Sequence, residues 1–332
     1  MSKCVQLPFC VPVFATVQSS AAPGLAMENH PTAYNAMLNQ CTSLTCTRKF
    51  LRGFTTPQVY IHRLGIYEFS CFERYVMCLK FSLPHIHSIV KKMLDEGFYI
   101  FYHNVDDFYM PGKSWYGTRH MYHDGVICGY DDGDKTYSIA AYDINWVYSL
   151  IRIPQDAFAK GIESALEARY YGNLLPYKIN VNEVKLDTNV MLKNLKEYVC
   201  NTVDKFSLEE DGSVNGTAVH DLLIMYIDKL IDGSVPHDKM DWRALRPIWE
   251  HKRCMLDRIR AVEQKYGWDD GLSKEYEAIV ELSNRARMTY AMYHKNEKKP
   301  LLEIVRRALD ELKQRDMEAV NKLIQRMEEE LK

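Results

Sequence analysis

Hydrophobic positions recur at helical spacing through most of the second half of the chain. From about residue 155 onward, apolar side chains return every three or four positions, and segments rich in Gly, Pro and Asp interrupt them. This spacing predicts helices at 155–170, 188–206, 216–232, 242–266, 272–297 and 300–331. The last has a narrow apolar stripe with oppositely charged neighbours, which suits packing on the body of the protein or, in a homodimer, on a second subunit.

The first half of the chain has short β-branched and aromatic runs between turns. An extended arm is predicted at Val5–Val17, a small-residue loop at 19–24 and a short helix from Pro31 to Leu38. Further along, the pattern predicts strands at 59–61 and 75–81, a helix at 83–97, and strands at 98–105, 125–130 and 136–142. The expected fold is α+β, with an antiparallel-sheet domain at 1–172 and an α-helical domain at 173–332.

Composition narrows the classes of function. The net charge of −2 offers no basic field for nucleic acid, and no apolar run reaches the roughly 18 residues of a membrane span. Nine cysteines without CxxC pairs or His/Cys ligand spacing argue against a metal site or a disulfide scaffold. We therefore expect a cytoplasmic protein that binds neither nucleic acid nor membrane.

The stretch from Tyr122 to Asp143 holds the strongest candidate chemistry. His123 precedes one predicted strand and Asp143 follows the next, so a hairpin would set them side by side. An aspartate that accepts from one imidazole nitrogen fixes the tautomer, which leaves the other nitrogen free to act as a base. The alternative is a strand-end histidine and a turn aspartate with no catalytic role.

The segment from Gly97 to Asp143 resembles the core of the butirosin-biosynthesis acyltransferase family, a branch of the papain-like cysteine peptidases. The shared pattern comprises the apolar strand at 98–105, Asp106 and Asp107 with Tyr109 and Pro111, His120 and His123, the run 127–131 that ends in Gly-Tyr-Asp, and Asp143. The helical stretch 240–259 also resembles the C-terminal helices of proteins of this group found beside nonribosomal peptide assembly lines.

The resemblance implies a papain-like fold and an amide-forming acyltransferase of thiotemplated secondary metabolism, the class that includes closthioamide assembly. The donor would be the phosphopantetheine thioester of an acyl or peptidyl carrier protein, and the acceptor a small or carrier-bound amine. The acyl group would pass through an enzyme cysteine, and no directly bound cofactor is implied. Two alternatives are a carrier-binding relative that has lost its nucleophile, and a cysteine peptidase with water as the acceptor.

The nucleophile is the missing part of this pattern. The family cysteine belongs at the start of the first helix, yet no cysteine lies between Cys10 and Cys41. Either Cys10 folds back across the helix start, or Ala26 or a neighbour stands in the position of the nucleophile.

Five further residues are candidate substrate-binding residues. His30 adjoins the predicted helix start, His120 competes with His123 for the cleft, and Asp106 could bind an acceptor amine. Trp115 and Tyr116 could line an acyl pocket or anchor their loop. Each also has an ordinary structural explanation as a loop or turn residue.

Overall fold

The chain folds into two compact units. The computed structural model describes residues 3–48, 56–201, 213–269 and 271–332. The first unit comprises residues 1–34 and 65–184, and the second comprises residues 35–64 and 185–332. The segment 35–64 thus belongs with the C-terminal helices, whereas the sequence-based division at 172 placed it in the first domain.

The first unit is built on an eight-stranded sheet whose neighbouring strands are all antiparallel. The strand order is β4-β10-β6-β7-β8-β9, with β1 beside β7 and β5 beside β10. The strands are β1 (Cys4–Gln6), β4 (Phe72–Arg74), β5 (Met77–Cys78), β6 (Tyr99–Asp106), β7 (Tyr122–Asp131), β8 (Thr136–Tyr142), β9 (Tyr148–Pro154) and β10 (Asn173–Ile179). The predicted strands at 98–105, 125–130 and 136–142 are confirmed as β6, β7 and β8.

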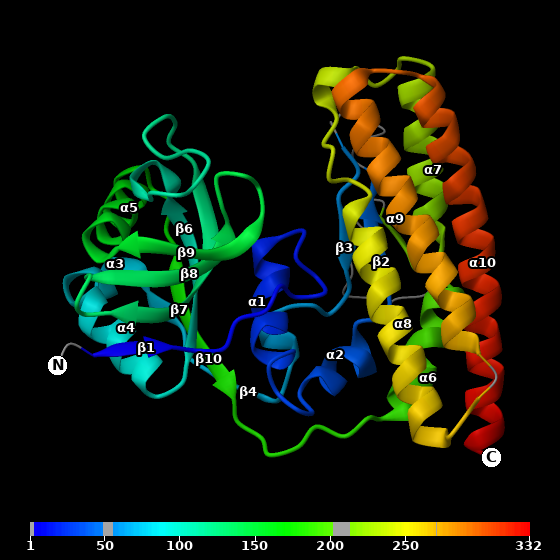
Figure 1. Ribbon diagram of the computed structural model, residues 1–332, viewed down its shortest axis with the longest axis horizontal. Coiled ribbons are helices and arrows are strands. Elements are labelled where there is room, and N and C mark those ends of the chain that lie inside the picture. The colour runs from blue at the N-terminus through cyan, green and yellow to red at the C-terminus, as the bar shows by residue number, and fades with distance from the viewer. Residues whose placement is uncertain (1–2, 49–55, 202–212, 270) are drawn as a thin grey trace. The chain divides into compact units, whose positions relative to one another are not determined.

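Helices cover both faces of this sheet (Figure 1). Alternate side chains of a strand point to opposite faces. The face that carries Tyr102 packs against α4 (Ile86–Asp95) and α5 (Gln155–Glu167). The other face carries Tyr177, whose hydroxyl donates to the carbonyl oxygen of Ala22 at 2.6 Å in α1 (Gln18–Met27). A short helix, α3 (Leu79–Ser82), follows β5.

Helix α1 occupies the residues 19–24 that the sequence analysis assigned to a small-residue loop, and it begins directly after the predicted extended arm. Its Ser, Ala, Pro and Gly residues have the composition of a turn, but Ala21, Ala22 and Leu25 are fully buried. Tertiary packing therefore overrides weak local propensity here. The helix predicted from Pro31 is α2 (Tyr34–Gln40), which belongs mainly to the second unit.

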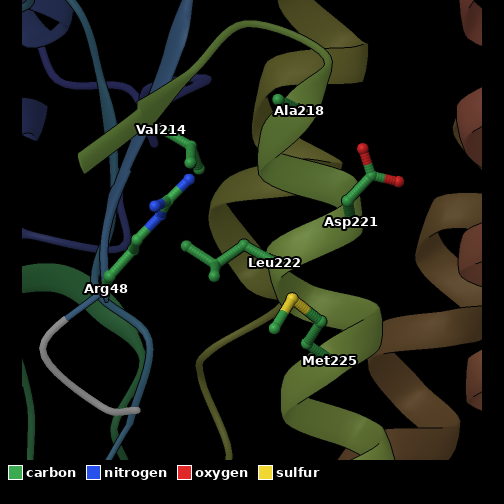
Figure 2. Close-up of a pocket in the computed structure, with 6 residues that line it drawn as sticks. All are labelled: Arg48, Val214, Ala218, Asp221, Leu222 and Met225. Atoms are coloured by element: carbon green, nitrogen blue, oxygen red, sulfur yellow. The ribbon is translucent and has the colours of Figure 1, made fainter. Parts of the chain in front are cut away.

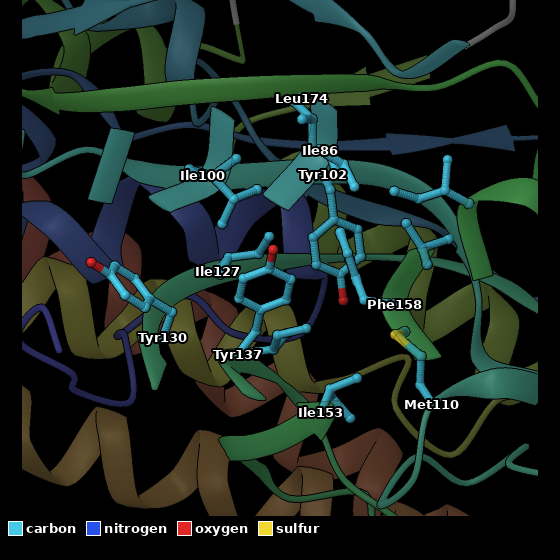
Figure 3. Packing of buried hydrophobic residues seen from close by; sticks show 14 of the residues in the cluster. Ile86, Ile100, Tyr102, Met110, Ile127, Tyr130, Tyr137, Ile153, Phe158 and Leu174 are labelled. Carbon is cyan, nitrogen blue, oxygen red and sulfur yellow. The ribbon is translucent and has the colours of Figure 1, made fainter. Parts of the chain in front are cut away.

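The core between the sheet and helices α4 and α5 is aliphatic with large aromatic rings (Figure 3). Tyr102, Tyr137 and Phe158 form edge-to-face contacts with centroid separations of 5.2 and 5.6 Å. All three rings are fully buried. This core fixes the positions of β6 and β7, whose adjoining ends carry the candidate site.

An irregularity in β6 shapes that end of the sheet. The register between β6 and β7 shifts between Tyr102 and Val105, and Asn104 there has a positive φ of 54°. Opposite the shift, Gly125 pairs with Tyr102, and a Cβ at Gly125 would collide with the Tyr102 hydroxyl. A β-bulge of this kind re-aims the side chains that follow it, here those of Asp106 and Asp107.

The second unit is mainly helical. Its helices are α2, α6 (Thr188–Val199), α7 (Ala218–Ile231), α8 (Arg246–Tyr266), α9 (Leu272–Asn296) and α10 (Pro300–Glu330), and a small antiparallel sheet has the order β11 (Ser213–Asn215), β2 (Leu44–Thr47), β3 (Val59–Ile61). The helical spacing predicted α5 to α10, although 202–206 of the second predicted helix lie outside the described residues. Helix α10 packs along α9, α7 and α6. In the described parts of the chain, no helix combines the length and apolarity that crossing a membrane requires.

Candidate active site

Two neighbouring aspartates at the end of β6 each bind one histidine. Asp106 Oδ2 lies 2.6 Å from Nδ1 of His120, and Asp107 Oδ2 lies 2.6 Å from Nδ1 of His123. Asp106 pairs with Tyr122 in the β6–β7 ladder, and Val105 pairs with His123. The ladder therefore brings both acid and imidazole groups to the same end of the sheet.

Asp106 is a structural acid. It is fully buried and accepts four hydrogen bonds: from His120 Nδ1 and Ser164 Oγ on Oδ2, and from the amides of Phe108 and Met121 on Oδ1. Burial alone would raise the pKa of Asp106, but the four hydrogen bonds together outweigh it and lower the pKa. A buried and fully bonded carboxylate has no accessible atom for an acceptor amine, so the structure gives Asp106 a different role from the predicted one.

His120 belongs to the same structural arrangement. Its ring stacks on Phe108 with a centroid separation of 4.4 Å while Nδ1 bonds to Asp106. Half of the His120 side chain is exposed. His120 therefore ties the loop residue Phe108 to the buried carboxylate of Asp106.

Asp107 and His123 have the geometry of a catalytic pair. The carboxylate of Asp107 is 2% exposed, whereas the side chain of His123 is 36% exposed. With Nδ1–H donated to Asp107, Nε2 of His123 has no hydrogen-bond partner among the described residues. A histidine oriented by a buried carboxylate, with its second nitrogen free, is the arrangement of a general base.

Lys113 completes this group, and the sequence analysis did not single it out. Its Nζ lies 3.7 Å from Asp107 Oδ1, and its side chain is only 3% exposed. Burial lowers the pKa of Lys113, and the carboxylate of Asp107 opposes that shift. The turn at Pro111 and Gly112 directs the lysine inward, and the φ of 84° at Gly112 is one that glycine adopts without strain.

Asp143, the predicted partner of His123, bonds to its own turn. Its Oδ1 accepts from the amides of Asn145 at 2.8 Å and Val147 at 2.9 Å, and Oδ2 accepts from Ser149 Oγ. The structure therefore pairs His123 with Asp107 instead of Asp143. The hairpin prediction was reasonable because β7 and β8 are paired, but their pairing ends at Val126 and Ala140, short of His123 and Asp143.

Cys10 has the surroundings of a structural thiol. Its sulfur accepts a hydrogen bond from Asn29 Nδ2 at 3.3 Å, at the C-terminal end of α1. Burial and then the nearby carboxylate of Glu28 raise the pKa of Cys10 to about 11, and the bond from Asn29 only partly offsets them. An activated cysteine needs the opposite surroundings, a helix N-terminus or a cation.

The start of α1 carries no cysteine. The cap residue is Val17, and the first turn holds Gln18, Ser19 and Ser20. Ala26 lies at the buried far end of this helix, 4% exposed. Its position is therefore not a helix-start position, contrary to the expectation from the sequence.

The remaining candidates contact their own surroundings. Nδ1 of His30 accepts from the amides of Thr32 and Ala33 at 3.3 and 3.1 Å, which stabilises the turn after α1. Trp115 makes an edge contact with Trp146, and half of Tyr116 is exposed. Among the described residues, no hydrogen bond or ring contact joins any of these three to His123.

A second group of ionisable side chains lies inside the helical unit. Lys252 Nζ is 2.8 Å from Asp316 Oδ2 and donates to the hydroxyl of Tyr198 at 2.9 Å, and Tyr198 and Tyr276 both donate to Asp316. All four side chains are fully buried. Since no atom of this network reaches solvent, it stabilises the helices rather than meeting a substrate.

A pocket of about 350 Å³ opens on the second unit between Val214 and the first turns of α7 (Figure 2). Its lining consists of Arg48, Val214, Ala218, Asp221, Leu222 and Met225. The carboxylate of Asp221 forms an ion pair with Lys313 at 2.6 Å. The pocket therefore offers mainly apolar contacts and no free base or nucleophilic side chain.

Within the described ranges, no three His, Cys, Asp or Glu side chains are grouped as metal ligands. The chain matches no family model and no curated protein sequence. The fold and site thus define an α+β protein that presents a carboxylate-oriented histidine at the end of an antiparallel sheet.

Proposed function

We propose that this protein is a papain-like acyltransferase that forms an amide from a carrier-protein thioester and an amine. The observation that carries the proposal is the bond of 2.6 Å between His123 Nδ1 and the buried carboxylate of Asp107, in a histidine side chain that is 36% exposed. The papain-like part of the proposal rests on the sequence resemblance of residues 97–143, and the acid that orients the histidine, Asp107, precedes it in the chain.

The base acts on the acceptor amine. His123 Nε2 takes a proton from the amine while the amine nitrogen attacks the thioester carbonyl. The C–N bond forms, the C–S bond breaks, and the pantetheine thiolate that leaves takes the proton from His123. A thioester is already activated, so this route needs no acyl-enzyme. The route through a cysteine has less support because burial raises the pKa of Cys10 to about 11 and no cysteine begins α1.

One second candidate function has its own supporting observation. The first turn of α1 has Gln18, Ser19 and Ser20 where a papain-like enzyme has its thiolate. This favours a non-catalytic relative that binds the carrier protein. The same observation counts against a cysteine peptidase, which requires that thiolate.

Acyl transfer can be followed with butyryl-pantetheine and benzylamine, together with intact-mass measurement of the protein. We expect amide formation by the unaltered protein without an acyl adduct. His123→Asn should lower the rate by about 10²–10⁴-fold, the usual contribution of a positioned base. The matched control is His120→Asn, which changes the neighbouring His120–Asp106 pair, whose bond is also 2.6 Å long. This variant should retain most of the activity.

The other outcomes separate the candidates. An adduct on Cys10, lost in Cys10→Ser together with activity, would replace the direct route by an acyl-cysteine route. Absence of amide with both pantetheine and carrier-bound donors, combined with binding of the carrier protein, would favour the non-catalytic candidate.

A further inference from the structure

The ammonium group of Lys113 is buried beside the carboxylate of Asp107. It interacts electrostatically with Asp107, Asp143 and Asp124, and Asp107 Oδ1 is 3.7 Å away. The lysine and Asp107 are 3% and 2% exposed, so solvent screens their interaction little. Burial of a lysine is unfavourable unless a nearby negative charge compensates it.

Only one of the three carboxylates depends on this lysine. Asp124 Oδ1 accepts from the amide of Asn104 at 3.2 Å, and Asp143 accepts from the amides of its own turn. Asp107 Oδ1, in contrast, is buried and has no hydrogen bond. Lys113 is therefore the group that balances the charge of Asp107.

A buried hydroxyl next to this pair is also unpartnered. The hydroxyl of Tyr102 has no hydrogen bond and interacts electrostatically with the carboxylates of Asp107 and Asp124. Tyr102 comes from β6, Lys113 from the loop after it, and Asp124 from β7. Among them, Lys113 supplies the only positive charge besides that of a protonated His123.

We propose that Lys113 is a positioning residue that holds Asp107 as a carboxylate and keeps His123 a neutral base with a free Nε2. Its catalytic consequence rests on the proposed function. With Lys113 in place, the buried charge of Asp107 is neutralised, and His123 donates Nδ1–H without needing a second proton. Without Lys113, the uncompensated carboxylate stabilises the imidazolium, which carries no lone pair for the amine proton.

The neighbouring pair provides an internal comparison. His120 and Asp106 have the same bond length of 2.6 Å, but no lysine or arginine forms an ion pair with Asp106 among the described residues. Removal of the Lys113 charge should therefore act on His123 and leave His120 unchanged. A general loss of structure would move both.

The test is an NMR titration of the histidine rings in the full-length protein. In Lys113→Met, the titration midpoint of His123 should rise by about one pH unit, a tenfold change in proton affinity, and Lys113→Arg should restore it. The His120 midpoint should not move. A His123 midpoint that shifts by less than about a third of a unit, or a parallel shift of His120, would overturn the proposal.

If Lys113→Met does not fold, a measurement on the unaltered protein still tests the proposal. Ring ¹⁵N shifts near neutral pH should report a neutral His123 with the proton on Nδ1, and an imidazolium there would overturn the proposal. None of these measurements uses an acyl donor. A displaced His123 midpoint in a protein that transfers no acyl group would refute the proposed function and leave the role of Lys113 intact.

Discussion

Removal of the buried lysine of the helical unit should destabilise that unit strongly. Lys252 and Asp316 are both 0% exposed and 2.8 Å apart, so Lys252→Met leaves a carboxylate charge in the interior. Breaking one partner of a buried ion pair typically costs about 3–5 kcal/mol. Tyr198 and Tyr276 still donate to Asp316 in the variant, so we expect the low end, about 3 kcal/mol.

An exposed ion pair of the same unit, between α10 and α9, provides a matched control. Lys322 Nζ lies 2.9 Å from both carboxylate oxygens of Glu275, and about half of each side chain is exposed. Lys322→Met removes the same charge by the same substitution but should cost no more than about 1 kcal/mol, because solvent screens the pair. Geometry alone does not distinguish the two lysines; burial does.

Urea unfolding followed by far-ultraviolet circular dichroism measures both variants, since most of the helical signal belongs to this unit. The double variant Lys252→Met/Asp316→Asn should recover part of the stability, because the neutral amide leaves no buried charge and still offers an oxygen to the tyrosine hydroxyls. Equal costs for Lys252→Met and Lys322→Met would refute the reasoning. A double variant less stable than Lys252→Met would also contradict it.

Three further outcomes follow from the described contacts. Burial lowers the pKa of His220 to about 4, so the folded unit binds fewer protons than the unfolded chain, and its stability should fall on acidification from about pH 6.5 towards 4. His220 should contribute about 2 kcal/mol of this loss at pH 5, and His220→Phe should remove that part in urea unfolding. Gly125→Ala should cost about 1–3 kcal/mol through the collision of its Cβ with the Tyr102 hydroxyl, and an unchanged thermal midpoint would contradict this. With the pKa of Cys10 at about 11, only about one thousandth of this thiol is thiolate at pH 8, so iodoacetamide should label the exposed Cys4 well before Cys10. Mass spectrometry that finds Cys10 labelled first would argue for an activated thiol.

The elements that the sequence predicted well are those whose pattern is local. Helical spacing predicts α8, α9 and α10 because each buries one continuous stripe. Strand β10 escaped notice because Pro176 lies within it, and proline argues against an interior strand. Helix α1 escaped notice because burial against the sheet, rather than propensity, stabilises it.

The candidate site divides in the same way. His123 stands out from its place at the start of an aliphatic strand, which is a local feature. Its pairing with Asp107 depends on the irregularity of β6 near Asn104, and such register shifts leave little trace in sequence. Lys113 lies in a Pro- and Gly-containing loop that has the composition of a solvated turn, so only the folded chain reveals that it is buried.

The comparison of Asp107→Asn with Asp143→Asn in the acyl-transfer assay tests the central claim most directly. Both variants replace an acid by its isosteric amide, and each removes one of the two competing partners of His123. The structure predicts that Asp107→Asn lowers the rate at least about 100-fold in folded protein, whereas Asp143→Asn stays within a few-fold of the unaltered protein. The reverse order would contradict the account and restore Asp143 as the acid that orients His123.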